Sequence, residues 1–169
     1  MTEYLSWRDG WSTGIDWVDV DHLEMVKRLN QLAEACQCAQ DDPSSRSGVP
    51  CKERVLACLD ALIEHNRRHF REEEDFLLRI AYPGFEAHRR EHVMQMAEFL
   101  DLRRDLERDL AQNLGPETLD EFKRWFFNHV IAEDHVYADF YHAQLAEQGP
   151  LEDEPDPLRT EGSGQPDQR

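Results

Sequence analysis

The sequence lacks the features that would take a chain to a membrane, to nucleic acid or out of the cell. No apolar run approaches the roughly 18 residues of a membrane-spanning helix, and the N-terminus has no basic start followed by an apolar stretch that would favour export. Basic residues are scarce, since 19 Lys and Arg stand against 36 Asp and Glu, a formal charge of −17. Because that charge repels phosphate and anionic lipid, we expect no nucleic-acid or membrane partner. The lack of an export signal and of a membrane span makes a cytoplasmic location the expectation.

Cysteine is also scarce. The four cysteines show no C-x-x-C pair, and four are too few for a disulfide scaffold in a chain of 169 residues. We expect reduced thiols, with Cys38 and Cys51, which flank one loop, as the alternative pair if oxidised. The length fits a single domain.

The last residues, GPLEDEPDPLRTEGSGQPDQR, have too little apolar material to fold. We therefore predict a folded domain over residues 1–148 and a disordered acidic tail over 149–169, with a docking tail or linker as the other interpretation. At the other end, WRDGWSTGIDWVDVDH is rich in tryptophan and turn residues. It is expected to form an ordered arm that packs across the end of the domain.

Helical periodicity dominates what is left, and no segment has the pattern of a strand. Four helices are expected, at about residues 18–39, 51–80, 85–113 and 116–147. Loop and breaker residues such as Tyr82-Pro83-Gly84 and Gly115-Pro116 separate them. The sequence thus predicts an all-α, up-down-up-down four-helix bundle.

The second helix has the clearest inward face. Its residues alternate steps of four and three, as in a bundle seam: Val55, Leu59, Leu62, Asn66, His69, Glu73, Phe76 and Ile80. The fourth helix is expected to point these residues inward: Leu119, Phe122, Trp125, Phe126, His129, Val136 and Phe140.

Each helix carries histidine on its apolar stripe, and the coincidence needs an explanation. The residues concerned are His22, His69, His88, His92 and His129, with Glu73 one turn after His69. Burying such groups without partners costs roughly 2–7 kcal/mol each, against a total stability of about 5–15 kcal/mol. A metal-free interaction module would have to satisfy them by mutual contacts, so we expect a metal instead.

The spacing supports a metal site. His88 and His92, four residues apart on one helical face, can both reach one ion. Imidazole with a few carboxylates suits iron, copper or zinc better than calcium or magnesium. Five imidazoles are too many for one ion, which indicates a two-metal centre with bridging carboxylates.

Several segments together resemble the hemerythrin family, in particular its bacterial members. They are WRDGWSTGIDWVDVDH, HFREEE followed by YPG, HRREH and WFFNHVIAED, and the resemblance extends over about residues 4–145. It implies a non-heme centre of two iron ions that share an oxo or hydroxo bridge.

The resemblance also implies which residues bind iron. His88, His92 and His129 would bind one iron, while His22 and His69 would bind the other and leave a position for O2. Glu73 and Asp134 would bridge the two ions. Asp134 follows His129 by five residues, about 140° round an ideal helix, so spacing alone places it on the flank. Its role rests on the resemblance.

The expected function is reversible O2 binding for storage, delivery or sensing, by a protein that is not an enzyme. With five imidazoles to two carboxylates, the ligand set is poorer in anions than in bundles that activate oxygen, which favours a reversible adduct. Trp125, Phe126 and Val130 would form an apolar roof over the O2 pocket and exclude water. The alternative is a di-iron redox enzyme acting on peroxide or nitric oxide, or iron handling.

Other polar residues receive no metal role. His65 is assigned either to the bundle rim or to a place behind the ligands or at the end of the pocket, and His135 and His142 are expected to be solvated. The neighbours of Glu73, which are Glu72, Glu74 and Asp75, are expected on a solvated face. O2 is the only partner indicated; no protein partner is, and we expect a monomer.

Overall fold

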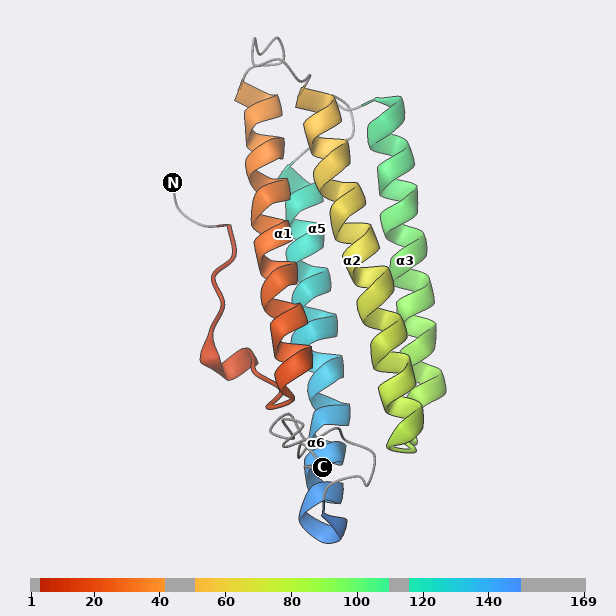
Figure 1. The fold of residues 1–169 in the computed structure, drawn as a ribbon. Coiled ribbons are helices and arrows are strands. Elements are labelled where there is room, and N and C mark those ends of the chain that lie inside the picture. Colours follow the sequence, from red (N-terminus) through yellow and green to blue (C-terminus); the bar gives the residue numbers. More distant parts are fainter. Residues whose placement is uncertain (1–3, 42–50, 110–115, 150–169) are drawn as a thin grey trace, which may run out of the picture.

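The computed structural model describes residues 4–41, 51–109 and 116–149. Figure 1 shows long helices lying side by side, preceded by an arm that contains the short 3-10 turn η1 (Asp9–Trp11). The helices are α1 (Asp16–Asp41), α2 (Cys51–Arg79), α3 (Phe85–Arg108), α5 (Pro116–Phe126), the π-helical turn η2 (Phe127–Glu133) and α6 (Asp134–Gln148). The described residues contain no strand and no helix long and apolar enough to cross a membrane.

The last three elements follow one another in a single rod, so the bundle has four columns. The all-α four-helix bundle expected from the sequence is confirmed. The tail predicted over 149–169 lies outside the described residues except for Gly149.

Helix α2 shows how the sequence pattern becomes a core. All eight residues of its predicted seam are buried, and none is more than 3% exposed. The helix ends where Ala81 adopts a positive φ of 51°, and α3 begins after Gly84. A Cβ atom on Gly84 would lie 2.7 Å from the Tyr82 ring, so any other residue there would require that ring to move.

The buried interior consists of two apolar clusters separated by a polar layer. The larger cluster contains Met25, Leu62 and Phe126, and the smaller one contains Val18, Phe76 and Tyr137. On α1, on α2 and on the fourth column, the buried histidines lie in sequence between a residue of one cluster and a residue of the other. Apolar packing on both sides therefore closes the polar layer off from water.

The fourth column is not a uniform α-helix. At its centre η2 forms a π-helical turn, in which the backbone N–H of Asp134 bonds to the carbonyl of His129, five residues earlier. Such a turn holds one more residue than an α-helical turn and is frequent at functional sites. It shifts the inward face of everything that follows by one residue.

This shift corrects the prediction for the C-terminal half of the column. Val136, expected inside, is 54% exposed, and Phe140 is only partly buried. Tyr137, Ala138 and Tyr141 take the inward positions. The prediction was wrong because it continued an α-helical period through the π turn.

The N-terminal arm is ordered, but it runs along the side of the bundle and not across its end (Figure 1). The Asn30 side chain on α1 exchanges two hydrogen bonds with the Leu5 backbone, at 2.8 and 2.7 Å. Further along, the Trp11 ring packs against Phe126 and Phe127, with centroids 5.7 and 5.4 Å apart. These contacts hold the arm against α1 and the fourth column, where Leu5 and Trp11 join the larger apolar cluster.

Two histidines expected to be solvated hold this arm in place. His135 Nε2 lies 3.2 Å from the Trp11 carbonyl, and His142 Nε2 lies 2.8 Å from the Thr13 carbonyl. The prediction was wrong for His135, which is partly buried, whereas His142 is exposed despite its hydrogen bond. Neither contact was expected, because the sequence predicted an arm across the end of the bundle and not along its side.

Asp19, in the first turns of α1, fixes the junction between arm and helix. It accepts hydrogen bonds from the backbone N–H and the hydroxyl of Thr13, at 2.7 and 2.8 Å, and from Ser12 Oγ. Burial by itself would raise the pKa of Asp19, but these hydrogen bonds outweigh it and hold the pKa below its usual value. The ionised carboxylate thus stabilises the junction.

We expect Asp19→Ala to lower the free energy of unfolding by about 1 kcal/mol at neutral pH, the scale of a lost cap. Because folding lowers the pKa of Asp19, its contribution is present above the carboxyl's unfolded pKa and disappears as the pH falls. Urea unfolding at neutral and acidic pH measures this. Asp16→Ala, an exposed acid in the same turn of α1, is the control; equal losses in both variants would contradict the assignment.

Candidate metal centre

The polar layer brings together all seven residues that the sequence marked as metal ligands. His22 comes from α1, His69 and Glu73 from α2, His88 and His92 from α3, His129 from η2, and Asp134 from the start of α6. All seven are buried. Their ligand atoms form two groups, each within 4.8 Å: Glu73, His88, His92 and His129; and His22, His69 and Asp134.

Asp134 spans the two groups. One of its oxygens, Oδ2, lies 3.2 Å from His22 Nε2, while Oδ1 lies 3.5 Å from His88 Nε2 and 3.8 Å from His129 Nε2. The π turn explains this inward position, which an α-helical period does not allow. The geometry suits a carboxylate that bridges two cations.

Glu73 is the other inward carboxylate. Its Oε2 lies 2.9 Å from His92 Nε2 and 3.3 Å from His88 Nε2, and its Oε1 has no hydrogen-bond partner. Burial would raise the pKa of Glu73, but hydrogen bonds from His88 and His92 reverse this and hold it well below the usual value. Burial and the charge of Glu73 raise the pKa of Asp134 well above its usual value. Two carboxylates in one dry layer therefore call for positive charge between them.

Two of the histidines supply neutral donor atoms. Burial lowers the pKa of His22 to about 4 and that of His129 well below its usual value, so both rings are neutral near pH 7. The Nε2 atoms of His22, His69 and His129 have no hydrogen-bond partner among the described residues. Unpartnered lone pairs converging on buried carboxylates are what a cation requires, so the residues fit a metal centre.

Two further carboxylates, neither expected from the sequence, orient ligand candidates from behind. Asp21 lies 3.3 Å from His69 Nδ1, and Glu74 lies 2.9 Å from His92 Nδ1. A ring that donates its Nδ1–H to a carboxylate keeps Nε2 free for metal. Glu74 was wrongly assigned to a solvated face, and it is 24% exposed. The sequence offered one general signal for such residues, because a metal-binding histidine usually donates its other ring N–H to a carboxylate or carbonyl.

His65 belongs to the same support and not to the rim. It is buried, and its Nε2–H donates to the Asp21 carbonyl over 3.0 Å. Its ring is parallel to that of His69, with centroids 6.4 Å apart. Asp21 thus contacts His65 through its backbone and His69 through its side chain.

The three residues predicted to form the O2 pocket are buried on the fourth column. Phe126 and Val130 are fully buried. The Trp125 ring stacks on His129 at 6.3 Å, and its indole N–H donates to Gln95 Oε1 over 2.6 Å. The structure therefore supplies apolar surface directly beside His129, and the role of this surface as an O2 pocket stays a prediction.

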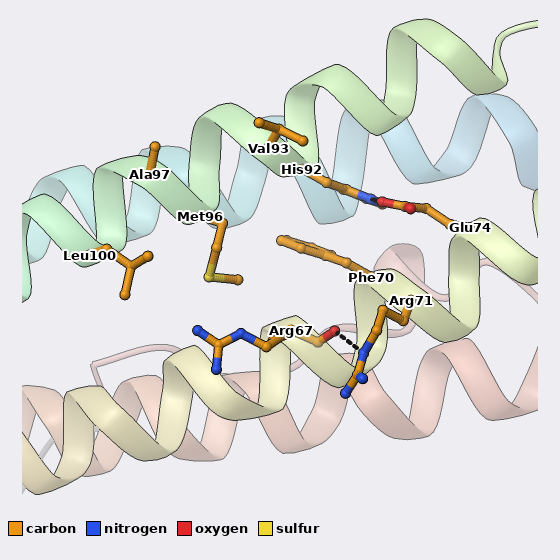
Figure 2. A pocket seen from close by; sticks show the side chains of 9 residues that line it. All are labelled: Arg67, Phe70, Arg71, Glu74, His92, Val93, Met96, Ala97 and Leu100. Atoms are coloured by element: carbon orange, nitrogen blue, oxygen red, sulfur yellow. Dashed lines mark hydrogen bonds and ion pairs between the residues drawn. The ribbon is translucent and has the colours of Figure 1, made fainter.

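Phe70, which the sequence did not mark, packs closest to the imidazoles. Its ring stacks on His92 with centroids 3.9 Å apart and meets His129 edge-on at 5.2 Å. Figure 2 shows Phe70 and His92 together at one end of a pocket between α2 and α3, of about 360 Å³, with Leu100 at the other end. Phe70 is therefore part of the wall between this pocket and His129, whereas His92 itself lines the pocket.

The support from Glu74 can be tested separately from the ligands. We expect Glu74→Ala to weaken metal binding by about 10- to 100-fold, because His92 loses the acceptor that fixes its ring. Competition with a chelator measures the affinity. Glu72→Ala is the matched control, since Glu72 is 52% exposed and contacts only Arg68 among the charged groups described. If the two variants release metal equally readily, the role of Glu74 is wrong.

Comparison with known proteins agrees with this arrangement. A family model described as the hemerythrin HHE cation binding domain matches residues 13–141. Curated relatives include the bacteriohemerythrin of Stenotrophomonas maltophilia, 28% identical over 83% of this chain and 84% of that protein. Another is the bacteriohemerythrin of Methylococcus capsulatus, 30% identical over 74% of this chain and 86% of that protein.

Solved structures show the same fold. Crystal structures of hemerythrin mutants superpose with a TM-score of 0.66 at 22% and 23% identity. They cover 82% of this chain and 97% of their own.

Proposed function

Because this chain belongs to the hemerythrin family, we propose that it binds O2 reversibly at a centre of two iron ions and is not an enzyme. The cation-binding description of the domain and the bacteriohemerythrin names of its relatives support this proposal. The functional unit is residues 1–148, and its cytoplasmic location and monomeric state stay predictions.

The buried layer of five imidazoles and two carboxylates carries the proposal. His88, His92 and His129 would hold one iron, and His22 and His69 the other, which keeps a position open. Glu73 and Asp134 would bridge the ions together with an oxo or hydroxo group. The position of Asp134 between the two histidine groups is the observation that favours two ions over one.

Iron would donate the electrons needed to bind O2, and the surrounding side chains would determine whether the bound molecule is released again as O2. Phe126 and Val130 are fully buried and exclude water from the fourth column's side of the layer. Asp21 and Glu74 fix two of the rings from behind. With five imidazoles to two carboxylates, the ligand set is poorer in anions than in bundles that activate oxygen, which favours binding over turnover.

Optical spectra test the proposal. Anaerobically reduced, iron-quantified protein should gain a visible charge-transfer band when air is admitted and lose it when O2 is removed, over repeated cycles. A redox enzyme would instead consume peroxide or nitric oxide catalytically, at rates that follow the iron content. Irreversible conversion to the oxidised form on the first exposure would favour that alternative or iron handling.

A further inference from the structure

One buried polar side chain, Asn66 of α2, is left without a role by the metal centre described above. It is fully buried, and neither its Nδ2 nor its Oδ1 has a hydrogen-bond partner among the described residues. An amide is costly to bury unpaired, and most buried polar groups in folded proteins are paired. An amide with both ends unpartnered therefore leaves a hydrogen-bond donor and an acceptor available to a small molecule that binds reversibly.

The position of Asn66 along α2 places it next to the ligands. It precedes His69 by three residues and Glu73 by seven, so it shares their inward face, one turn from His69. In Figure 1, α5 runs in the same direction as α2, and Phe126 likewise precedes His129 by three residues. Asn66 and the fully buried Phe126 thus occupy the same level of the bundle.

The two carboxylates lie on the other side of the histidines. Glu73 follows His69 by four residues, and Asp134 follows His129 by five across the π turn. Because the two columns run in parallel, both carboxylates are displaced toward the same end of the bundle. Neither Glu73 nor Asp134 lies on the side that faces Asn66 and Phe126, so a small molecule bound to the His22–His69 ion has that side left to it.

We propose that the Asn66 amide donates a hydrogen bond to a small ligand at this open position and makes the pocket selective for ligands that accept one. The inference rests on the proposed function. O2 gains negative charge when a reduced metal donates to it, and azide carries a full charge, so both accept hydrogen bonds. A buried amide strengthens the binding of such ligands, because a hydrogen bond to a charged acceptor is stronger in a low-dielectric site than in water.

Azide is the probe, titrated optically into the oxidised, iron-loaded protein. Asn66→Leu, an apolar side chain of similar size, should weaken azide binding by about tenfold or more, the scale of a hydrogen bond to a charged group. Asn66→Thr keeps an O–H donor and should bind azide more tightly than Asn66→Leu. Leu62 lies one turn before Asn66 on α2, farther from the ligands. Leu62→Met changes packing without removing a donor and should bind azide as the unaltered protein does.

A second readout needs no metal. In the iron-free protein, Asn66→Leu should unfold at a higher urea concentration than the unaltered chain, because it replaces an unpaired buried amide with apolar surface. A lower midpoint would show that the amide has partners within the protein and would overturn the proposal. Unchanged azide affinity in Asn66→Leu with full iron content would also overturn it.

Failure of the proposed function looks different. If the unaltered protein holds two irons but binds no azide, there is no open position, and both conclusions fall. If it holds fewer than two irons, the ligand assignment fails first. If it binds azide equally well with leucine, threonine or asparagine at residue 66, the di-iron site stands and only the hydrogen bond is wrong.

Discussion

Replacing His129 with alanine should lower the bound iron to well below two ions per chain. His129 is fully buried, and neither of its ring nitrogens has another partner among the described residues. Its removal leaves Glu73, His88 and His92 as the ligand candidates of that group. Because the site is closed to solvent, several water molecules cannot readily replace the missing imidazole. Iron analysis of purified, reconstituted protein measures the effect.

The controls for His129→Ala are within the chain. His142→Ala removes an exposed histidine that belongs to neither ligand group and contacts the Thr13 carbonyl, and it should keep two irons. His92→Ala should behave like His129→Ala. If both His92→Ala and His129→Ala retain two irons while remaining helical by circular dichroism, the ligand assignment is refuted.

Replacing Phe70 with alanine should open the metal centre to solvent. The Phe70 ring lies against His92 and His129 and lines the pocket between α2 and α3 (Figure 2). Losing it joins that pocket to the polar layer and costs about 3–5 kcal/mol of stability, the usual range for a buried phenylalanine. We expect faster loss of iron to a chelator and faster irreversible oxidation in air, both followed by absorbance.

Leu100→Ala separates access from simple loosening of the pocket. Leu100 lines the same pocket at the end away from the imidazoles and is 38% exposed. It should lose iron at the rate of the unaltered protein. If Phe70→Ala retains iron and resists oxidation as Leu100→Ala does, the ring is not what closes the centre.

Regular helical periodicity made much of the bundle predictable. The α2 seam follows one period from Val55 to Ile80, and every residue in it is buried as expected. The ligand candidates could be picked out because histidines recur on apolar faces, where an unpaired imidazole is costly. The resemblance to a known family added Asp134, which spacing alone placed on the flank.

The errors arose where contacts are not periodic. The π turn at Phe127–Glu133 places Asp134 inward and Val136 outward, the reverse of what an α-helical period predicts. No residue pattern in that segment indicates a π turn. The partners of the ring nitrogens were also missed, because Asp21 and Glu74 contact histidines on other helices. Pairing between helices depends on rotation and axial shift, which one sequence does not reveal.

The path of the N-terminal arm was missed for a similar reason. Its tryptophans and turn residues indicated order, but its course depends on hydrogen bonds to distant residues. Asn30 holds the Leu5 backbone, and His135 and His142 hold the backbone near Trp11 and Thr13. Each contact joins residues that have no local sequence relation.

The measurement that tests the central claim most directly is an oxygen balance on reduced protein of known iron content. We expect one O2 taken up for every two irons and the same amount returned under vacuum, with the protein ready for another cycle. Uptake without return, or release of hydrogen peroxide in place of O2, would contradict reversible binding at a two-iron centre.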